Sequence, residues 1–106
     1  MELNGILQKA VMILSAKVNA EKIYLFGSQA NHTSNKDSDI DLMVIAPSDK
    51  PQKIRNSEVR LALVGLKHSF DVFVYTPQEI EEYSSLLSSI PWTAINKGEL
   101  IYEQHQ

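Results

Sequence analysis

Hydrophobic residues follow two kinds of spacing along this chain, and the spacing predicts a mixture of helices and strands. Residues 3–19 carry apolar side chains at helical intervals, which predicts an amphipathic helix. The segments KIYLF (22–26), DIDLMVI (39–45) and FDVFVY (70–75) are short and rich in β-branched and aromatic residues, which is typical of strands. Residues 51–67 place apolar side chains among charged ones, so a second helix is predicted there.

The last third of the chain carries signals for the ends of helices. TPQE (76–79) matches a capping box with proline at the first helical position, so a helix is predicted to begin there. We expect Pro91 to end this helix, and a short further helix to run through Asn96 and close at Gly98. LIYE (100–103) is predicted to be the last strand, at the edge of the sheet.

The order of these elements predicts an α/β (α+β) fold, a small mixed sheet with helices packed on it. A helix separates the second and third strands, and such a crossover joins parallel strands. Only the polar segment 28–38 joins the first and second strands, so we expect these two to be antiparallel.

This topology predicts that one end of the sheet collects several polar residues and a glycine. Gly27 and Ser28 close the first strand. Asp39 and Asp41 open the second strand, which begins where its antiparallel neighbour ends. Asp71 opens the third strand, which runs parallel to the second. Three carboxylates and a Gly-Ser turn are therefore expected to converge.

The paired aspartates suit a divalent cation. Side chains two residues apart in a strand point to the same face, so Asp39 and Asp41 aim together, whereas Ile40 and Leu42 face the other side. Mg²⁺ prefers oxygen ligands and usually takes one or two carboxylates plus phosphate oxygens. Asp71 could complete a second metal site or act as the base for an attacking hydroxyl. Two such ions clamp the attacking and leaving oxygens of a phosphoryl transfer.

The Gly-Ser turn could supply the phosphate-binding half of such a site. Gly27 allows close approach of the backbone to a phosphate, and the Ser28 hydroxyl could donate to a phosphate oxygen. Taken alone, Gly-Ser is a common turn, and Asp-x-Asp is often a solvated loop end. The convergence of both with Asp71 favours a site that binds metal and phosphate.

Length and composition restrict the remaining possibilities. The 106 residues predict a single domain, 1–106. The absence of cysteine excludes disulfides and thiolate metal sites and fits a reducing compartment. Glu2 and Lys9 interrupt the N-terminal apolar residues, so we expect neither a signal peptide nor a membrane span, and a cytoplasmic protein.

The charge balance argues against a broad nucleic-acid-binding surface. The net charge is −3, and the only arginines are Arg55 and Arg60. Together with Lys50 and Lys53 they could form a basic stripe, which we interpret as the solvated face of a helix.

The motif GSQANHTSNKDSDIDL (27–42), with a third aspartate on a later strand, resembles the DNA polymerase β-like nucleotidyltransferase superfamily. The short length and the ending KGELIYE (97–103) are most similar to the minimal nucleotidyltransferases of bacteria and archaea. The resemblance extends from about Ile23 to Tyr102, nearly the whole chain. It implies a palm-like nucleotidyltransferase fold.

The resemblance also implies roles for the residues at the predicted end of the sheet. Gly27 and Ser28 would hold the triphosphate of ATP or another nucleoside triphosphate. Asp39 and Asp41 would bind Mg²⁺, and Asp71 would match the third carboxylate, which assists the attacking group. After Gly-Ser the family commonly has x-Ala-Arg-Gly, whereas this chain has asparagine and histidine at the last two positions, Asn31-His32.

Two functions follow. The first is transfer of a nucleotide, AMP, to a hydroxyl on a partner protein, because a domain of this size leaves little room for an acceptor-binding module. The resemblance suggests a small helical HEPN-type toxin as the partner and an antitoxin role for this chain. The alternative is a binding module that sequesters its partner after losing catalysis with the Asn31-His32 change. A small-molecule nucleotidyltransferase is less favoured, because those enzymes resemble longer chains with an extra helical domain.

Overall fold

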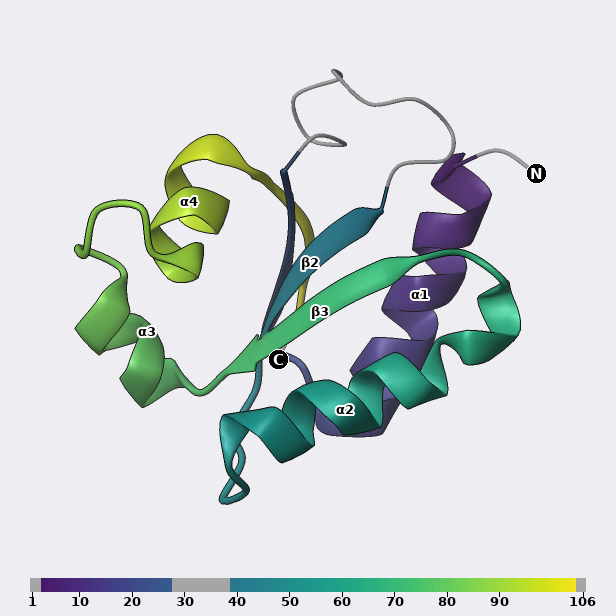
Figure 1. Cartoon of the computed structure of the whole chain (residues 1–106), viewed down its shortest axis with the longest axis horizontal. Coiled ribbons are helices and arrows are strands. Elements are labelled where there is room, and N and C mark those ends of the chain that lie inside the picture. The colour runs from purple at the N-terminus through teal and green to yellow at the C-terminus, as the bar shows by residue number, and fades with distance from the viewer. Residues whose placement is uncertain (1–2, 28–38, 105–106) are drawn as a thin grey trace.

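The computed structural model describes residues 3–27 and 39–104 (Figure 1). The elements of these residues, in chain order, are α1 (Leu3–Val18), β1 (Lys22–Phe26), β2 (Ile40–Ile45), α2 (Gln52–Ala62), the 3₁₀ helix η1 (Val64–Leu66), β3 (Phe70–Tyr75), α3 (Pro77–Tyr83), α4 (Ile90–Lys97) and β4 (Glu99–Glu103). This order confirms the predicted alternation of helices and strands.

The strands form a sheet in the order β3-β2-β1-β4. β1 pairs antiparallel with β2 and with β4, and β2 pairs parallel with β3. The predicted mixed sheet and the edge position of the last strand are both confirmed. The fold is the mixed α/β arrangement expected of a nucleotidyltransferase.

Alternating side chains divide between the two faces of the sheet. One face packs on α1 and α2, through a cluster that includes Ile40, Leu42 and Val72. The other face packs on α3 and α4, through a cluster that includes Met43 with Phe73 at its margin. Figure 1 shows the two helix pairs on opposite sides of the strands. Asp41 and Asp71 alternate with the residues of β2 and β3 that pack on α1 and α2. Their side chains therefore point to the side of the sheet that carries α3 and α4.

The C-terminal helices differ from the sequence prediction. Helix α3 ends at Tyr83, well before Pro91, so the prediction that Pro91 ends this helix is wrong. Pro91 lies in the first turn of α4, whose N-cap Ser89 accepts a hydrogen bond from the Trp92 N–H. Proline is tolerated there because the first N–H groups of a helix have no partner within it.

The second helix is also shorter than predicted. α2 ends at Ala62, and η1 continues the path to Leu66, followed by Lys67 with a φ of +54°. The left-handed conformation at Lys67 turns the chain into β3.

The predicted capping box is present, and it joins a contact that the sequence did not indicate. Thr76 Oγ1 accepts from the Glu79 N–H at 3.2 Å, and Glu79 Oε1 accepts from the Thr76 N–H at 2.9 Å. The Glu79 carboxylate also accepts two hydrogen bonds from Arg55, at 2.8 and 2.9 Å. The Arg55 side chain is only 8% exposed and also donates to Val74 O, so its assignment to a solvated helix face is wrong. The ion pair between Arg55 and Glu79 connects α2 with α3 across β3.

No helix within residues 3–27 and 39–104 combines the length and apolar character needed to cross a membrane.

Candidate functional site

Asp41 and Asp71 lie directly beside each other on adjacent strands. They are register partners in the parallel pairing of β2 and β3, and both strands begin at this end of the sheet. Asp39 is exposed and precedes the first residue of β2, Ile40, which is fully buried on the opposite face. The structure thus brings together the carboxylates that the topology argument placed at one end. Their roles in binding metal remain a prediction.

The electrostatics of Asp41 reflect this crowding. Burial raises the pKa of the Asp41 carboxyl above its ordinary value, and the neighbouring charges of Asp71 and then Asp39 raise it further. Each of these effects disfavours the ionised form of Asp41. A cation bound between the carboxylates would reverse the last two effects, because it would replace repulsion by attraction.

The closeness of the Asp41 carboxylate leaves no room for a side chain at position 27, so this position requires glycine. The φ of Gly27, +77°, lies in the left-handed region that favours glycine. A Cβ atom at position 27 would also overlap the carboxylate oxygen Oδ2 of Asp41. The end of β1 therefore lies against the Asp41 carboxylate, as the antiparallel pairing of Phe26 with Asp41 requires. Ser28 and the Asn31-His32 pair lie outside the described residues.

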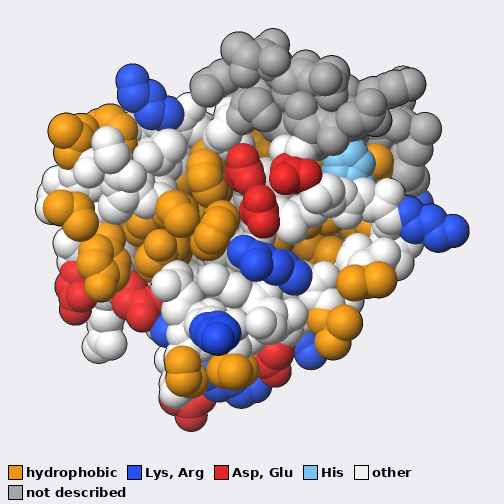
Figure 2. Space-filling view, viewed as in Figure 1, with side chains coloured by type: hydrophobic (Ala, Val, Ile, Leu, Met, Phe, Trp, Pro, Cys, Tyr) orange, Lys and Arg blue, Asp and Glu red, His pale blue; other side chains and the backbone are white. Residues whose placement is uncertain are grey.

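Arg60 is a member of this group that the sequence analysis assigned to a solvated helix face. Its Nη2 atom lies 3.9 Å from Asp71 Oδ1, and its guanidinium carbon lies 5.3 Å from the centroid of the Phe73 ring. Figure 2 shows the acidic side chains at the surface with a basic group directly beside them and apolar side chains next to both. The predicted topology could have indicated that Arg60 lies close to the aspartates. In a parallel crossover, the last turn of the helix returns to the end of the sheet where the next strand begins.

The donor set fits the chemistry of Mg²⁺ in part. Among the residues that the structure describes, no three His, Cys, Asp or Glu side chains form a group arranged to hold a metal ion. Mg²⁺ does not need such a cage, since it commonly binds one or two carboxylates and takes its other oxygens from water and substrate phosphates. Asp41 and Asp71, adjacent and in register, supply that number of carboxylates.

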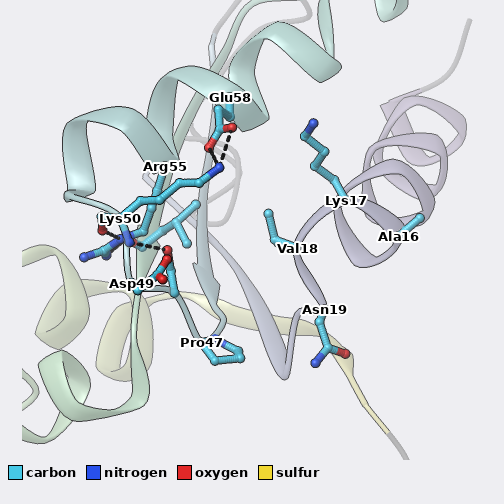
Figure 3. A pocket seen from close by; sticks show the side chains of 11 residues that line it. Ala16, Lys17, Val18, Asn19, Pro47, Asp49, Lys50, Arg55 and Glu58 are labelled. Carbon is cyan, nitrogen blue, oxygen red and sulfur yellow. Dashed lines mark hydrogen bonds and ion pairs between the residues drawn. The ribbon is translucent and has the colours of Figure 1, made fainter.

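A hollow of about 440 Å³ lies at the opposite end of the sheet (Figure 3). It is bordered by the end of α1, by residues 47–50 after β2, and by α2. Lys50 faces into it and donates to both carboxylate oxygens of Glu58, at 3.0 and 2.9 Å. Of the predicted site residues, the four that the structure describes (Gly27, Asp39, Asp41 and Asp71) do not line this hollow, so it is separate from the aspartate group.

The fold and the aspartate group together define a class of protein: nucleotidyltransferases, in which acidic side chains on neighbouring strands face a glycine turn. The family model described as "Polymerase beta, Nucleotidyltransferase" matches residues 8–106. The chain therefore belongs to the polymerase β nucleotidyltransferase family. This confirms the family expected from residues 27–42.

One solved structure, described as the crystal structure of a toxin–antitoxin with AMP-PNP, has a similar fold. The TM-score is 0.62 at 23% identity, and the match covers 98% of this chain and 76% of that one. At this identity the likeness concerns the fold. A search of the curated proteins found no match.

Proposed function

We propose that this protein transfers AMP from ATP to a hydroxyl on a partner protein in a Mg²⁺-dependent reaction, and that it acts as the antitoxin of a HEPN-type toxin. The observation that carries this proposal is the register pairing of Asp41 with Asp71, against the glycine turn at Gly27. Membership of the nucleotidyltransferase family supports the reaction type.

Each residue at this end of the sheet has a role in the proposed reaction. Asp39, Asp41 and Asp71 would hold the metal, and Gly27 and Ser28 would hold the triphosphate. Mg²⁺ neutralises charge that develops on the phosphate oxygens.

The proposed transfer makes one bond and breaks one. The acceptor oxygen forms a bond to the α-phosphorus, and the bond from that phosphorus to the departing pyrophosphate breaks. The proton of the acceptor hydroxyl passes to the carboxylate of Asp71, which lies at the side of Asp41 away from Gly27.

Two observations support a protein as the acceptor. The structural neighbour is described as a toxin–antitoxin with AMP-PNP, so a chain of similar fold occurs in a protein complex that contains a nucleotide analogue. In this chain, Leu61 on α2 and the adjacent Leu86 and Leu87 in the turn between α3 and α4 are large apolar side chains that are exposed. Exposed apolar side chains of this kind are available for association with a protein.

The proposal is tested with the product of the adjacent gene. The two proteins are mixed with Mg²⁺ and ATP labelled at either the α- or the γ-phosphate. We expect the partner to retain the α-label and not the γ-label, because AMP carries only the α-phosphate. Asp41→Asn should abolish the labelling.

A stable complex that never takes up the α-label would contradict the proposed reaction. That result would support the alternative function, a binding module that sequesters its partner. The Asn31-His32 departure from the family motif is the observation that favours this alternative.

A further inference from the structure

Arg60 belongs to α2, yet its guanidinium lies on the other side of the sheet. α2 packs on one face through the buried Val59, whereas Asp71 and Phe73 alternate with the residues buried on that face. β3 is one of the two edge strands of the sheet. The Arg60 side chain therefore passes around the β3 edge to reach the Phe73 ring and the Asp71 carboxylate.

This placement is not explained by stability. The side chains of Arg60 and Asp71 are 42% and 47% exposed, and their closest atoms are 3.9 Å apart. An exposed ion pair at that distance contributes little to folding, and a cation–π contact at an exposed site, such as that with Phe73, contributes only modestly. Arg55, five residues earlier, provides the contrast, since it is buried and its donors are used by Glu79, Val74 and Lys50. Within the described part of the chain, the guanidinium of Arg60 donates no hydrogen bond.

The residues of the site lie in a fixed order across the end of the sheet. Gly27 follows the end of β1, Asp41 lies on β2, Asp71 lies on β3, and Arg60 lies beyond the β3 edge. Neighbouring strands are about 4.8 Å apart, so Gly27 and Asp71 are separated by roughly 10 Å. Arg60 is thus on the far side of the carboxylates from the turn that would hold the triphosphate.

In-line transfer places the attacking and leaving oxygens on opposite sides of the α-phosphorus. If pyrophosphate leaves toward Gly27, the acceptor hydroxyl must approach from the β3 side, over Asp71. The side chains that it meets there are Arg60 and Phe73. An arginine held over an aromatic ring presents a planar set of donors suited to a carboxylate.

We propose that Arg60 is an acceptor-positioning residue, which binds an acidic side chain next to the acceptor hydroxyl of the partner protein. The inference rests on the proposed function and adds to it the chemistry of the acceptor. Arg60 exchanges its long contact with Asp71 for a bidentate contact with the partner's carboxylate. Asp71 is then left to the metal and to the proton of the acceptor hydroxyl.

The experiment compares the wild type with Arg60→Gln, Arg60→Lys and a control variant, Lys53→Gln. Lys53 is exposed on the same helix, so its replacement removes one positive charge from α2 without touching the site. Kd is measured for Mg²⁺–AMP-PNP and for the partner, and transfer kinetics are measured with each substrate varied in turn.

For Arg60→Gln we expect the KM for the partner to rise about tenfold or more, because one charge-assisted contact is lost. The Kd of Mg²⁺–AMP-PNP should stay within about twofold of the wild type, since the residue lies away from the triphosphate. Arg60→Lys should fall between the wild type and Arg60→Gln, because it keeps the charge and loses the planar fork. Added salt should raise the partner KM of the wild type more than that of Arg60→Gln. Lys53→Gln should resemble the wild type.

Two results would overturn the assignment. Weaker AMP-PNP binding by Arg60→Gln with an unchanged partner KM would place Arg60 on the triphosphate side. If Arg60→Gln changed neither the Kd of Mg²⁺–AMP-PNP nor the KM for the partner, Arg60 would have no role in binding either substrate. A wild type that binds the partner without transferring AMP contradicts the proposed function instead, and the partner Kd values of the variants then decide the contact made by Arg60.

Discussion

The Cα atom of Gly27 and the carboxylate of Asp41 are so close that a side chain at position 27 would overlap Asp41 Oδ2. The contact joins the end of β1 to the start of β2, the two strands whose antiparallel pairing brings the turn and the carboxylate together. It links the proposed phosphate-binding and metal-binding halves of the site through one pair of residues.

Gly27→Ala should therefore destabilise the protein by about 2 kcal/mol or more, through the left-handed φ and the overlap with Asp41. In an Asp41→Ala background the overlap is removed, and the same change should cost only about 1 kcal/mol. Urea unfolding of the two single variants and the double variant measures this coupling. Equal costs in both backgrounds would show that the backbone conformation alone requires glycine.

Asp41→Asn should leave the metal-free protein as stable as the wild type or slightly more stable at pH 7. Burial and the charges of Asp71 and Asp39 raise the pKa of Asp41, so the folded state binds the proton more tightly than the unfolded state. The contribution of Asp41 to the stability of the wild type should therefore fall as pH rises through the range above 3.8, the ordinary value. The advantage of the variant should be largest above the folded pKa of Asp41 and should disappear below 3.8.

The same variant should respond weakly to ligand. Mg²⁺ with ATP should raise the Tm of the wild type by mass action, and that of Asp41→Asn much less. Asp49→Asn, an exposed carboxylate bordering the hollow at the other end of the sheet, is the matched control. An Asp41→Asn protein that is less stable without metal yet responds normally to Mg²⁺–ATP would mean that Asp41 has a structural role.

The Arg55–Glu79 pair should make the fold sensitive to acid. The hydrogen bonds from Arg55 hold the pKa of Glu79 below its ordinary value of 4.5. Its contribution to stability is complete above that value and is lost as pH falls through the folded pKa. Glu79→Gln should cost roughly 1 to 2 kcal/mol at pH 7 and flatten the loss of stability below pH 4.5. Chemical unfolding across pH 2 to 7 should separate it from Glu81→Gln, an exposed neighbour on α3; identical profiles would contradict the assignment.

The partner is expected to bind exposed apolar side chains of either residues 51–67 or residues 77–97. Leu61 and Leu87 form a matched pair for this test, because they are 74% and 71% exposed. Leu→Asp at either position should leave the Tm nearly unchanged, and one of the two should weaken the complex by about tenfold or more. Calorimetry with the adjacent gene product measures the affinity. Full affinity in both variants would place the partner elsewhere.

Local sequence determined most of the elements of this protein. The strands KIYLF and FDVFVY have the predicted bounds, and the capping box at Thr76 and Glu79 forms as expected. Strand patterns and capping signals depend on residues that are close in the chain, so they can be recognised from the sequence alone. The order of helices and strands then sufficed to place Asp41 and Asp71 at the same end of the sheet, since it decides which strands are parallel; the register that makes them direct neighbours came from the structure.

Tertiary structure decided which charged side chains belong to the core and to the site. Arg55 and Arg60 are five residues apart on one helix, yet the first is buried against Glu79 and the second reaches Asp71 around the edge of the sheet. α3 ends at Tyr83, and Pro91 lies in the first turn of the next helix. Each of these outcomes depends on how α2 and α3 pack against β3. Contacts between residues distant in the chain, which the spacing of hydrophobic residues does not encode, determine that packing.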